Sequence, residues 1–302
     1  MKPADAQAQQ PAPLALDHPS VASLRPATLA RVQACVSGDL EPVKPRDSAT
    51  VVLVREAGHT LQAFLQRRVP SMSFAPGMHV FPGGGVDPKD HDVISWAGPH
   101  PSVWAKRLDC TEVRAKAIVV AAVRETFEEC GVLLASRSSD GPAVRADGED
   151  WKLDRIALSD RSISIAELLR RRALKLRSDL LHPWSNWVTP EWSPARYDTV
   201  FLVARLPDGQ YPSQLGGESD QGSWLTPAQA VRGYSEQSLS MMLPTVSTMR
   251  ELSRHDSIAA ILSIARDIRP LMVRPLIRAG QLQLVIDGPR GPVTKDVYLS
   301  KL

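Results

Sequence analysis

The sequence predicts an α+β fold or a three-layer α/β/α sandwich. Two β-rich runs come early, at 48–56 and 60–69, and the clearest helix of the chain follows at 111–131. Another strand is expected at 196–206. These elements do not follow the regular strand–helix alternation of a doubly wound sheet, so a mixed arrangement of strands and helices is the better class.

The N-terminal part is expected to begin as an arm and to continue as a hairpin. Residues 1–45 are rich in Pro, Ala and Gln and predict a mostly mobile arm, with a short helix at 27–36. The runs 48–56 and 60–69 flank the turn "EAGH" and predict a β-hairpin. A short strand at 78–81 runs into "PGGGVDPKD", whose glycines and prolines predict irregular structure.

The helix at 111–131 ends at a glycine that serves as its C-cap, Gly131. At 100° per residue, apolar side chains gather on one side of it: Val113, Val119, Val120, Val123, Phe127 and Cys130. Three acidic side chains gather on the other side: Glu125, Glu128 and Glu129. No period is clear in the segment before this helix, and Cys130 is predicted to be a core thiol.

The rest of the chain continues as mixed helices and strands. Helices are expected at 150–158 and 164–178, a helix opened by Thr226 and Pro227, two helices across 236–268, and strands joined by glycine turns in the tail. We expect one main domain at 46–235 and a C-terminal helical and β extension at 236–302 that packs on it. Three tryptophans, Trp184, Trp187 and Trp192, are interpreted as packing residues, and stacking on an adenine is the alternative.

Composition limits the classes of partner. The formal net charge is only +3, and the one basic run, "LLRRRALKLR", is interpreted as a solvated helix face, so no nucleic-acid partner is expected. The three cysteines show no paired spacing of a zinc site or a disulfide framework. No apolar run approaches the length of a membrane span, so no membrane partner is expected.

The three glutamates carry the chemical signal. At spacings i, i+3 and i+4 their carboxylates lie close enough to repel one another unless a positive charge lies among them. A hard divalent cation, Mg²⁺ or Mn²⁺, suits such oxygen ligands. An exposed acidic helix end is the alternative. The glycine turn after the strand at 78–81 favours the cation, because its backbone can approach a metal or a phosphate closely.

These residues resemble the Nudix box, G-x5-E-x7-R-E-U-x-E-E-x-G-U, in which U is apolar. The second half matches as Arg124, Glu125, Glu128, Glu129, Gly131 and Val132, with Thr126 at an aliphatic position. The first half matches at Gly84, with Asp90 in place of the first glutamate. The two halves are separated by an extra 26 residues, at about 91–115, and we expect this insertion to bulge outward without moving the metal ligands.

The resemblance implies a Nudix fold, which is an α/β/α sandwich with a mixed sheet, here with extra C-terminal helices and strands. It implies hydrolysis of a diphosphate with Mg²⁺ or Mn²⁺ held by Glu125, Glu128 and Glu129 and by the carbonyl of Gly84. Arg124 would orient a box carboxylate, and the general base would be one of the glutamates or Glu218 in the loop "GGESD". In the family, the first acidic residue of the box braces the loop against the helix.

The insertion is similar to that of the Nudix branch that includes the mammalian peroxisomal enzymes acting on coenzyme A and acyl-CoA. Substrate contacts are expected from Arg67, Arg68, Gly83, Gly84 and Gly85. The two arginines end a strand near the glycine loop, and a solvated strand end is the alternative for them. The coenzyme A signature of this branch is only partly present, because Ser73 stands where its second arginine belongs. ADP-ribose, a dinucleotide or a damaged nucleotide is the alternative substrate, and a non-catalytic nucleotide-sensing module is the alternative from another class.

The partners implied are a small nucleotide diphosphate substrate and, because family members often form dimers, a second copy of the chain. The chain ends in Ser300, Lys301 and Leu302, which matches the peroxisomal signal S-K-L. The Ala-, Arg- and Val-rich composition favours a bacterial source, and bacteria have no peroxisomes. We expect a cytoplasmic protein, with the peroxisome as the alternative.

Overall fold

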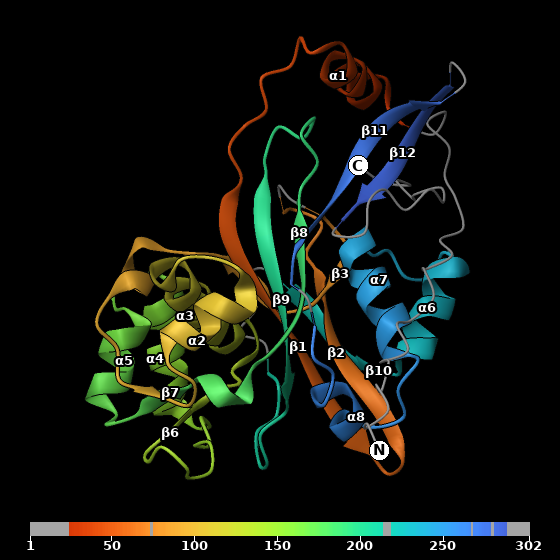
Figure 1. Cartoon of the computed structure of the whole chain (residues 1–302). Helices are drawn as coiled ribbons and strands as arrows, with labels where there is room; N and C mark the ends of the chain where they lie inside the picture. Colours follow the sequence, from red (N-terminus) through yellow and green to blue (C-terminus); the bar gives the residue numbers. More distant parts are fainter. Residues whose placement is uncertain (1–23, 73–74, 214–218, 267, 279–280, 289–302) are drawn as a thin grey trace, which may run out of the picture.

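The computed structural model of the chain describes residues 24–72, 75–213, 219–266, 268–278 and 281–288. A mixed sheet forms its centre and has the order β10-β2-β1-β9-β8-β11-β12 (Figure 1). Its strands are β1 (Arg46–Ala57), β2 (Thr60–Arg68), β8 (His182–Val188), β9 (Tyr197–Arg205), β10 (Ser219–Leu225), β11 (Pro270–Arg278) and β12 (Gln281–Asp287). β1 is parallel to β9 and β11 is parallel to β8, whereas the other neighbours are antiparallel.

Helices cover both faces of this sheet (Figure 1). One face carries α2 (Pro101–Leu108), α3 (Glu112–Cys130), α4 (Glu149–Ser159) and α5 (Ile165–Arg171), together with a small sheet of β5 (Trp96–Ala97), β6 (Ala135–Ser136) and β7 (Lys175–Arg177). The other face carries α6 (Pro227–Ser235), α7 (Leu243–Leu252) and α8 (Ile258–Leu262). The N-terminal helix α1 (Pro26–Ser37) lies near β11. The predicted α/β/α arrangement with a mixed sheet is confirmed.

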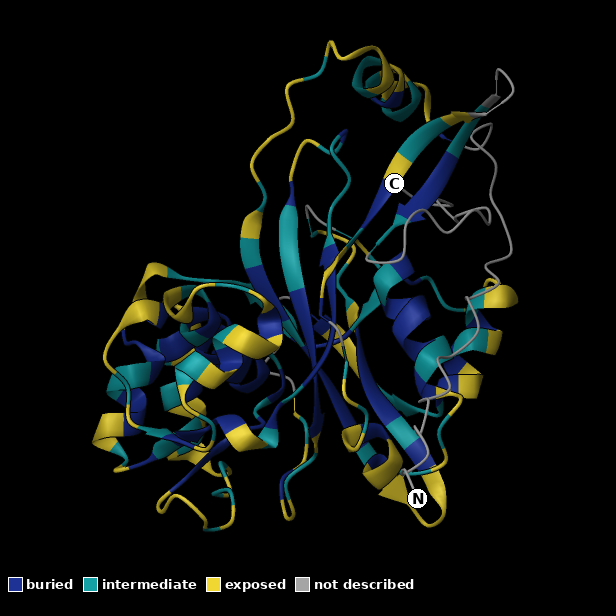
Figure 2. Cartoon of the chain, viewed as in Figure 1, coloured by how far each residue is buried: buried dark blue, intermediate teal, exposed yellow. Residues whose placement is uncertain are grey.

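The core is divided into two clusters, one on each face of the sheet, and the strands at the centre are buried (Figure 2). Strand alternation makes this division, because successive side chains point to opposite faces. In β1, Val51 and Leu53 pack with α3, whereas Val52 and Val54 pack with the helices of the other face. The first cluster supports the helix that carries the acidic residues.

Most of the strongest predicted elements are confirmed. The hairpin forms from β1 and β2, the helix at 111–131 becomes α3, and the strand at 196–206 becomes β9. Thr226 caps α6 by accepting a hydrogen bond from the backbone N–H of Gln229 at 3.0 Å. The core also contains Cys130 and the three tryptophans Trp184, Trp187 and Trp192, whose exposed fractions are 1%, 7% and 2%. The packing interpretation of the tryptophans therefore holds.

The prediction of irregular structure for the glycine run is wrong. Gly83–Gly85 form a strand, β4, that pairs antiparallel with residues 48–50 of β1. The pairing depends on the missing side chain of Gly83, because a Cβ there would lie 2.7 Å from the Cα of Thr50. Glycine therefore permits a close strand contact here. A one-turn 3-10 helix, η2 (Pro88–His91), follows directly.

The box insertion is not the outward bulge that we expected. It contains β5 and α2, and α2 packs on α3 with Trp104 fully buried and Leu108 4% exposed. A helix of eight residues with two buried side chains is too short to show a clear period. The insertion therefore contributes to the core around the acidic helix.

Three further details differ from the sequence prediction. The second helix of the polar stretch ends at Arg171 and is followed by β7, because Ala173 adopts a positive φ of 52° and Leu176 is buried in the core. Val113 is 66% exposed, so it does not belong to the apolar side of α3. Residues 219–225 form β10, which was not predicted.

No helix in the described part of the chain is long and apolar enough to cross a membrane. The predicted N-terminal arm up to residue 23 lies outside the described residues, as do Ser73, Glu218 and the terminal Ser300, Lys301 and Leu302.

Candidate active site

Helix α3 brings the three glutamates to the edge of the glycine strand. Thr111 caps the start of the helix and Gly131 ends it with a positive φ of 72°. Helix α3 packs beside β1 and β4. Acidic side chains are unfavourable near a helix C-terminus, and the last turn of α3 has no basic residue of its own. Compensating charge must therefore come from other groups.

Arg124 is the main compensating group, and all five of its N–H donors are used. Its Nε and Nη2 atoms bond the two carboxylate oxygens of Asp90, both at 2.9 Å. Nη2 also bonds the carbonyl oxygen of Gly85 at 2.8 Å. Nη1 bonds Glu125 at 2.8 Å and Glu128 at 3.2 Å. An arginine with five donors so engaged orients its neighbours and has no donor left for a ligand.

Asp90 joins the two halves of the box. Its carboxylate is fully buried and caps η2 by accepting from the backbone N–H of Asp87 at 2.8 Å. The same carboxylate holds Arg124 on α3, 34 positions along the chain. The position of the family's bracing acid is thus occupied by an aspartate that contacts both loop and helix.

Glu129 is held by two donors from the sheet. One of its oxygens, Oε2, accepts hydrogen bonds from the side-chain amide of Gln66 and from the backbone N–H of Gly83 at 3.0 Å. Gln66 lies on β2, and sequence reasoning did not identify it. Its contact with Glu129 depends on which face of β2 it occupies, and no local pattern around it gives that information.

The glycine strand lies in direct contact with the acidic residues. A Cβ at Gly84 would lie 2.7 Å from Oε2 of Glu125, whereas a Cβ at Gly85 would meet nothing closer than 3.9 Å. Only the absence of a side chain at Gly84 lets the carboxylate of Glu125 approach the backbone. Gly83, Gly84, Glu125 and Glu129 therefore form one continuous surface.

The electrostatics of this surface favour a cation. Burial, followed by the negative charge of Glu125, raises the pKa of Glu128 to about 8, although Arg124 opposes the shift. The side chains of Glu125 and Glu128 are only 13% and 15% exposed, so they are not the exposed acidic helix end of the alternative interpretation. Three carboxylates, those of Asp90, Glu125 and Glu128, contact the single positive charge of Arg124. Oxygen donors with excess negative charge suit a hard divalent cation.

A second arginine, on helix α4, holds the C-terminal end of α3. Arg155 on α4 is 3% exposed, and its Nε bonds the backbone carbonyl of Glu128 at 2.8 Å. Its Nη1 bonds the hydroxyl of Ser213 at 3.2 Å. Sequence reasoning missed this residue, because it lies 27 positions beyond the helix residue that it contacts.

The glutamates are not arranged as a completed metal site. Within the residues that the structure describes, no group of three His, Cys, Asp or Glu side chains is placed to hold a metal ion. Glu125 and Glu128 turn toward Arg124, whereas Glu129 turns toward Gln66 and Gly83. The donor chemistry and charge fit a divalent cation, and binding would require Glu125 and Glu128 to exchange their present contacts with Arg124.

The two arginines at the end of β2 occupy different positions. Arg67 forms a two-bond ion pair with Asp220 at 2.8 and 2.7 Å, and this pair holds the pKa of the aspartate below its usual range. Strand alternation places Arg67 on the face opposite to Gln66, and Arg68 on the same face as Gln66. The structure therefore does not bring Arg67 to the acidic residues.

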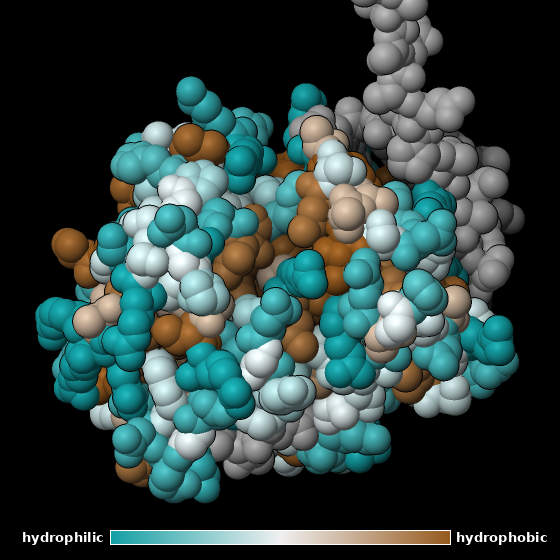
Figure 3. Space-filling view, turned by 90° about the horizontal axis from the view of Figure 1, so that it is seen from below, coloured by the Kyte–Doolittle hydropathy of each residue, from teal (hydrophilic) through white to brown (hydrophobic). Residues whose placement is uncertain are grey.

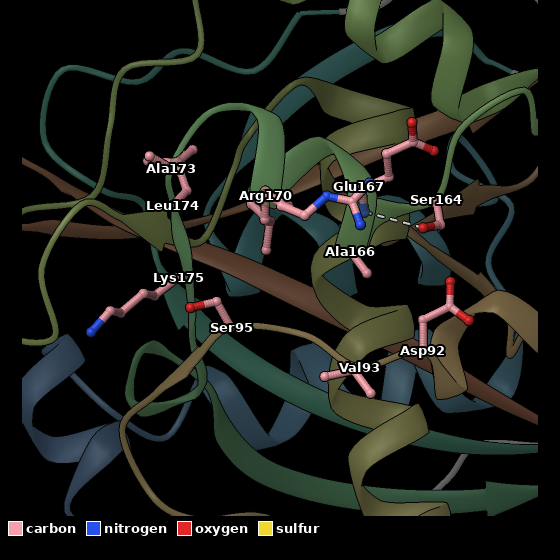
Figure 4. Close-up of a pocket in the computed structure, with 11 residues that line it drawn as sticks. Asp92, Val93, Ser95, Ser164, Ala166, Glu167, Arg170, Ala173, Leu174 and Lys175 are labelled. Carbon is pink, nitrogen blue, oxygen red and sulfur yellow. Dashed lines mark hydrogen bonds between the residues drawn. The ribbon is translucent and has the colours of Figure 1, made fainter.

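A cavity of about 640 Å³ lies elsewhere, between the segment after η2 and helix α5 (Figure 4). Asp92 and Glu167 line it together with Arg170 and Lys175, so its charges balance. None of the box glutamates lines it. The cavity therefore offers no excess charge for a nucleotide. Seen from below, the molecular surface shows apolar side chains in patches bordered by hydrophilic ones (Figure 3).

The fold and the box residues define the class of the protein. A family model described as the NUDT19 Nudix domain matches residues 105–253, a range that contains α3 and its glutamates but begins after the glycine strand. Over these residues the chain is similar to the Nudix superfamily. The crystal structure of a Nudix hydrolase from Alicyclobacillus acidocaldarius is similar, with a TM-score of 0.61 and 25% sequence identity over 74% of this chain and 97% of that one.

Among characterised relatives, the chain is similar to acyl-coenzyme A diphosphatase NUDT19. The human protein is 28% identical over 239 residues, and the Gallus gallus protein is 27% identical over 237 residues; each match covers 65% of this chain. Putative nudix hydrolase 7 of Caenorhabditis elegans is 25% identical over 209 residues and 69% of this chain. The chain spans 61% of the length of each of these relatives.

Proposed function

We propose that this protein hydrolyses a diphosphate linkage in a nucleoside diphosphate derivative with the help of a divalent cation. The observation that carries the proposal is the packing of Glu125 against the backbone of Gly84, beside Glu128 and Glu129. This packing gathers carboxylates beside the backbone of the glycine strand, with excess negative charge. Similarity to the Nudix superfamily supports the same reaction.

The proposed ligands of Mg²⁺ or Mn²⁺ are Glu125, Glu128, Glu129 and the carbonyl oxygen of Gly84. A divalent cation bound there would neutralise charge on the diphosphate and lower the pKa of a water molecule. Arg124 and Asp90 hold the glutamates in place, and the backbone N–H of Gly83 fixes one oxygen of Glu129. The proton of the attacking water would pass to one of the glutamates or to Glu218, which lies outside the described residues.

Coenzyme A or acyl-CoA is the substrate that we favour, with 3',5'-ADP and (acyl-)4'-phosphopantetheine as products. The similarity to acyl-coenzyme A diphosphatase NUDT19 supports this choice. ADP-ribose, dinucleotides and damaged nucleotides are the alternatives, since Ser73 replaces an arginine of the coenzyme A signature. A nucleotide-sensing module without catalysis is opposed by the retention of all three box glutamates.

The test is a substrate panel with products identified by mass spectrometry. Wild type with Mg²⁺ or Mn²⁺ is offered coenzyme A, acyl-CoA, ADP-ribose, NADH, diadenosine polyphosphates and oxidised nucleotides. Glu128→Gln should abolish turnover with the fold intact, and Glu112→Gln, at the exposed first turn of the same helix, should not. The proposal fails if wild type cleaves none of these diphosphates with either metal.

Location and assembly also belong to the proposal. We propose a cytoplasmic protein, because the Ala-, Arg- and Val-rich composition favours a bacterial source, with the peroxisome as the alternative. We also propose a homodimer, because members of the family often form dimers. Sedimentation of the purified chain measures its assembly state directly.

A further inference from the structure

Gln66 is a fully buried amide on β2, a position where a polar side chain requires a specific partner. Its neighbour Leu65 faces the core on the opposite side of the sheet, whereas Phe64 and Gln66 face the side of α3. Gln66 is thus a polar residue at the point where the sheet meets the end of the acidic helix.

The orientation of this amide is fixed by chemistry. Its Nε2 atom donates to Oε2 of Glu129, and the reversed orientation would place the amide oxygen against a carboxylate oxygen. Oε2 of Glu129 also accepts from the backbone N–H of Gly83 at 3.0 Å. Two donors from separate strands therefore hold the same carboxylate oxygen.

The other end of the amide has an acceptor still to be satisfied. The Oε1 atom of Gln66 is buried and has no hydrogen-bond partner among the described residues. The residue opposite Gln66 on β10 is Gly222, so the paired position supplies no side-chain donor. A buried acceptor of this kind beside a site usually receives a donor from water or a ligand.

We propose that Gln66 is a positioning residue that fixes the carboxylate of Glu129 for binding of a divalent cation. The inference rests on the proposed function, because it assumes that Glu129 is a ligand. Partners that orient metal ligands typically change metal affinity or activity by about 10- to 100-fold when they are removed. Gln66 acts through Glu129, and its own amide oxygen is buried and has no partner among the described residues.

The test compares Mn²⁺ binding by the full chain and its variants, measured by calorimetry, with circular dichroism to confirm the fold. Gln66→Leu should weaken Mn²⁺ binding about tenfold or more. The matched control is Gln62→Leu. Gln62 lies on the same face of β2, and its amide oxygen accepts a hydrogen bond from Arg55 at 2.9 Å. The control variant should bind Mn²⁺ with an affinity within about twofold of wild type. Turnover of the best substrate of the panel should follow the same order.

A double-variant cycle separates positioning from general damage. In a Glu129→Gln background, Gln66→Leu should cause no further loss of Mn²⁺ affinity, because the residue that it orients is already altered. Should Gln66→Leu fail to fold, Gln66→Asn replaces it throughout, with the amide kept but its reach shortened. The inference is overturned if the folded Gln66 variant binds Mn²⁺ as wild type does, or if the losses of the two single variants add.

The two proposals can fail separately. If wild type neither binds Mn²⁺ nor cleaves any diphosphate, the proposed function fails and the inference fails with it. If wild type binds the metal and turns over substrate while the Gln66 variant is unchanged in both, only the inference fails.

Discussion

Asp90 and Arg124 are joined by two hydrogen bonds of 2.9 Å, and the carboxylate of Asp90 is fully buried. This pair connects η2 to the middle of α3, so it closes the Nudix box across the insertion. The aspartate also accepts a hydrogen bond from the backbone N–H of Asp87. Asp90 therefore holds the loop after the glycine strand against α3, although the insertion separates the two in sequence.

Loss of this pair should destabilise the protein. Asp90→Ala leaves the guanidinium of Arg124 buried without its main partner, which typically costs about 3–5 kcal/mol. The exposed ion pair of Arg145 and Asp147 provides the control, and Asp147→Ala should change the free energy of unfolding by about 1 kcal/mol or less. Urea unfolding measures both. Equal effects of the two substitutions would show that Asp90 is not a structural brace.

The two neighbouring glycines of β4 should respond differently to alanine. Gly84→Ala places a methyl group against the carboxylate of Glu125 and should lower turnover by about 100-fold, because the carboxylate must move. Gly85→Ala meets nothing closer than 3.9 Å and should keep nearly full activity. Steady-state kinetics on the best substrate of the panel, with circular dichroism as a check on the fold, tests the pair. Full activity of Gly84→Ala would contradict the arrangement of the site.

The metal-free protein should lose stability as the pH rises. Burial raises the pKa of Glu128 from 4.5 to about 8, so the native state binds this proton more tightly than the unfolded state does. The stabilising contribution is therefore complete below about pH 4.5 and is lost as the pH rises through about 8. Its size is on the order of 2–4 kcal/mol.

In the Glu128→Gln variant the side chain at position 128 cannot ionise. Its free energy of unfolding should therefore lack the part of the decline with pH that Glu128 causes. Urea unfolding between pH 5 and pH 9 in EDTA compares the two proteins. Addition of Mn²⁺ should restore the stability of wild type at high pH more than that of the variant, because a cation bound to the native state stabilises it. Parallel pH profiles for the two proteins would refute the assignment.

The two arginines of β2 should differ in their effect on substrate binding. Arg68 faces the side of the acidic residues, and Arg68→Ala should raise KM about tenfold or more if it contacts a phosphate. Arg67 is paired with Asp220 on the other face, so Arg67→Ala should leave KM within about twofold of wild type. A larger effect of Arg67 than of Arg68 would place the substrate on the opposite face of the sheet.

The sequence was sufficient for the local part of the site. The spacing of Glu125, Glu128 and Glu129 on one helix face and the C-cap at Gly131 depend only on helix geometry, so both could be predicted. The hairpin of β1 and β2 likewise depends on a local turn. These features follow from residues that are near one another in the chain.

Contacts between distant segments could not be predicted in the same way. The partnership of Gln66 with Glu129 joins residues 63 positions apart and depends on the register of β2 against α3. The glycine strand was missed because glycine has a low β-propensity, and only the close packing against Thr50 explains its pairing. Helix α2 was missed because tertiary burial of Trp104, and not a local period, stabilises it.

The insertion that interrupts the box has a consequence for how such chains change over evolution. Trp104 and Leu108 of the insertion are buried in the same core cluster as the apolar side of α3. Excision of the 26 extra residues, which include α2, would restore the motif spacing and, at the same time, remove Trp104 and Leu108 and open a hole beside the acidic helix. The core of the domain therefore depends on the side chains of the insertion. A chain that loses the insertion needs larger side chains in the neighbouring elements to fill the space.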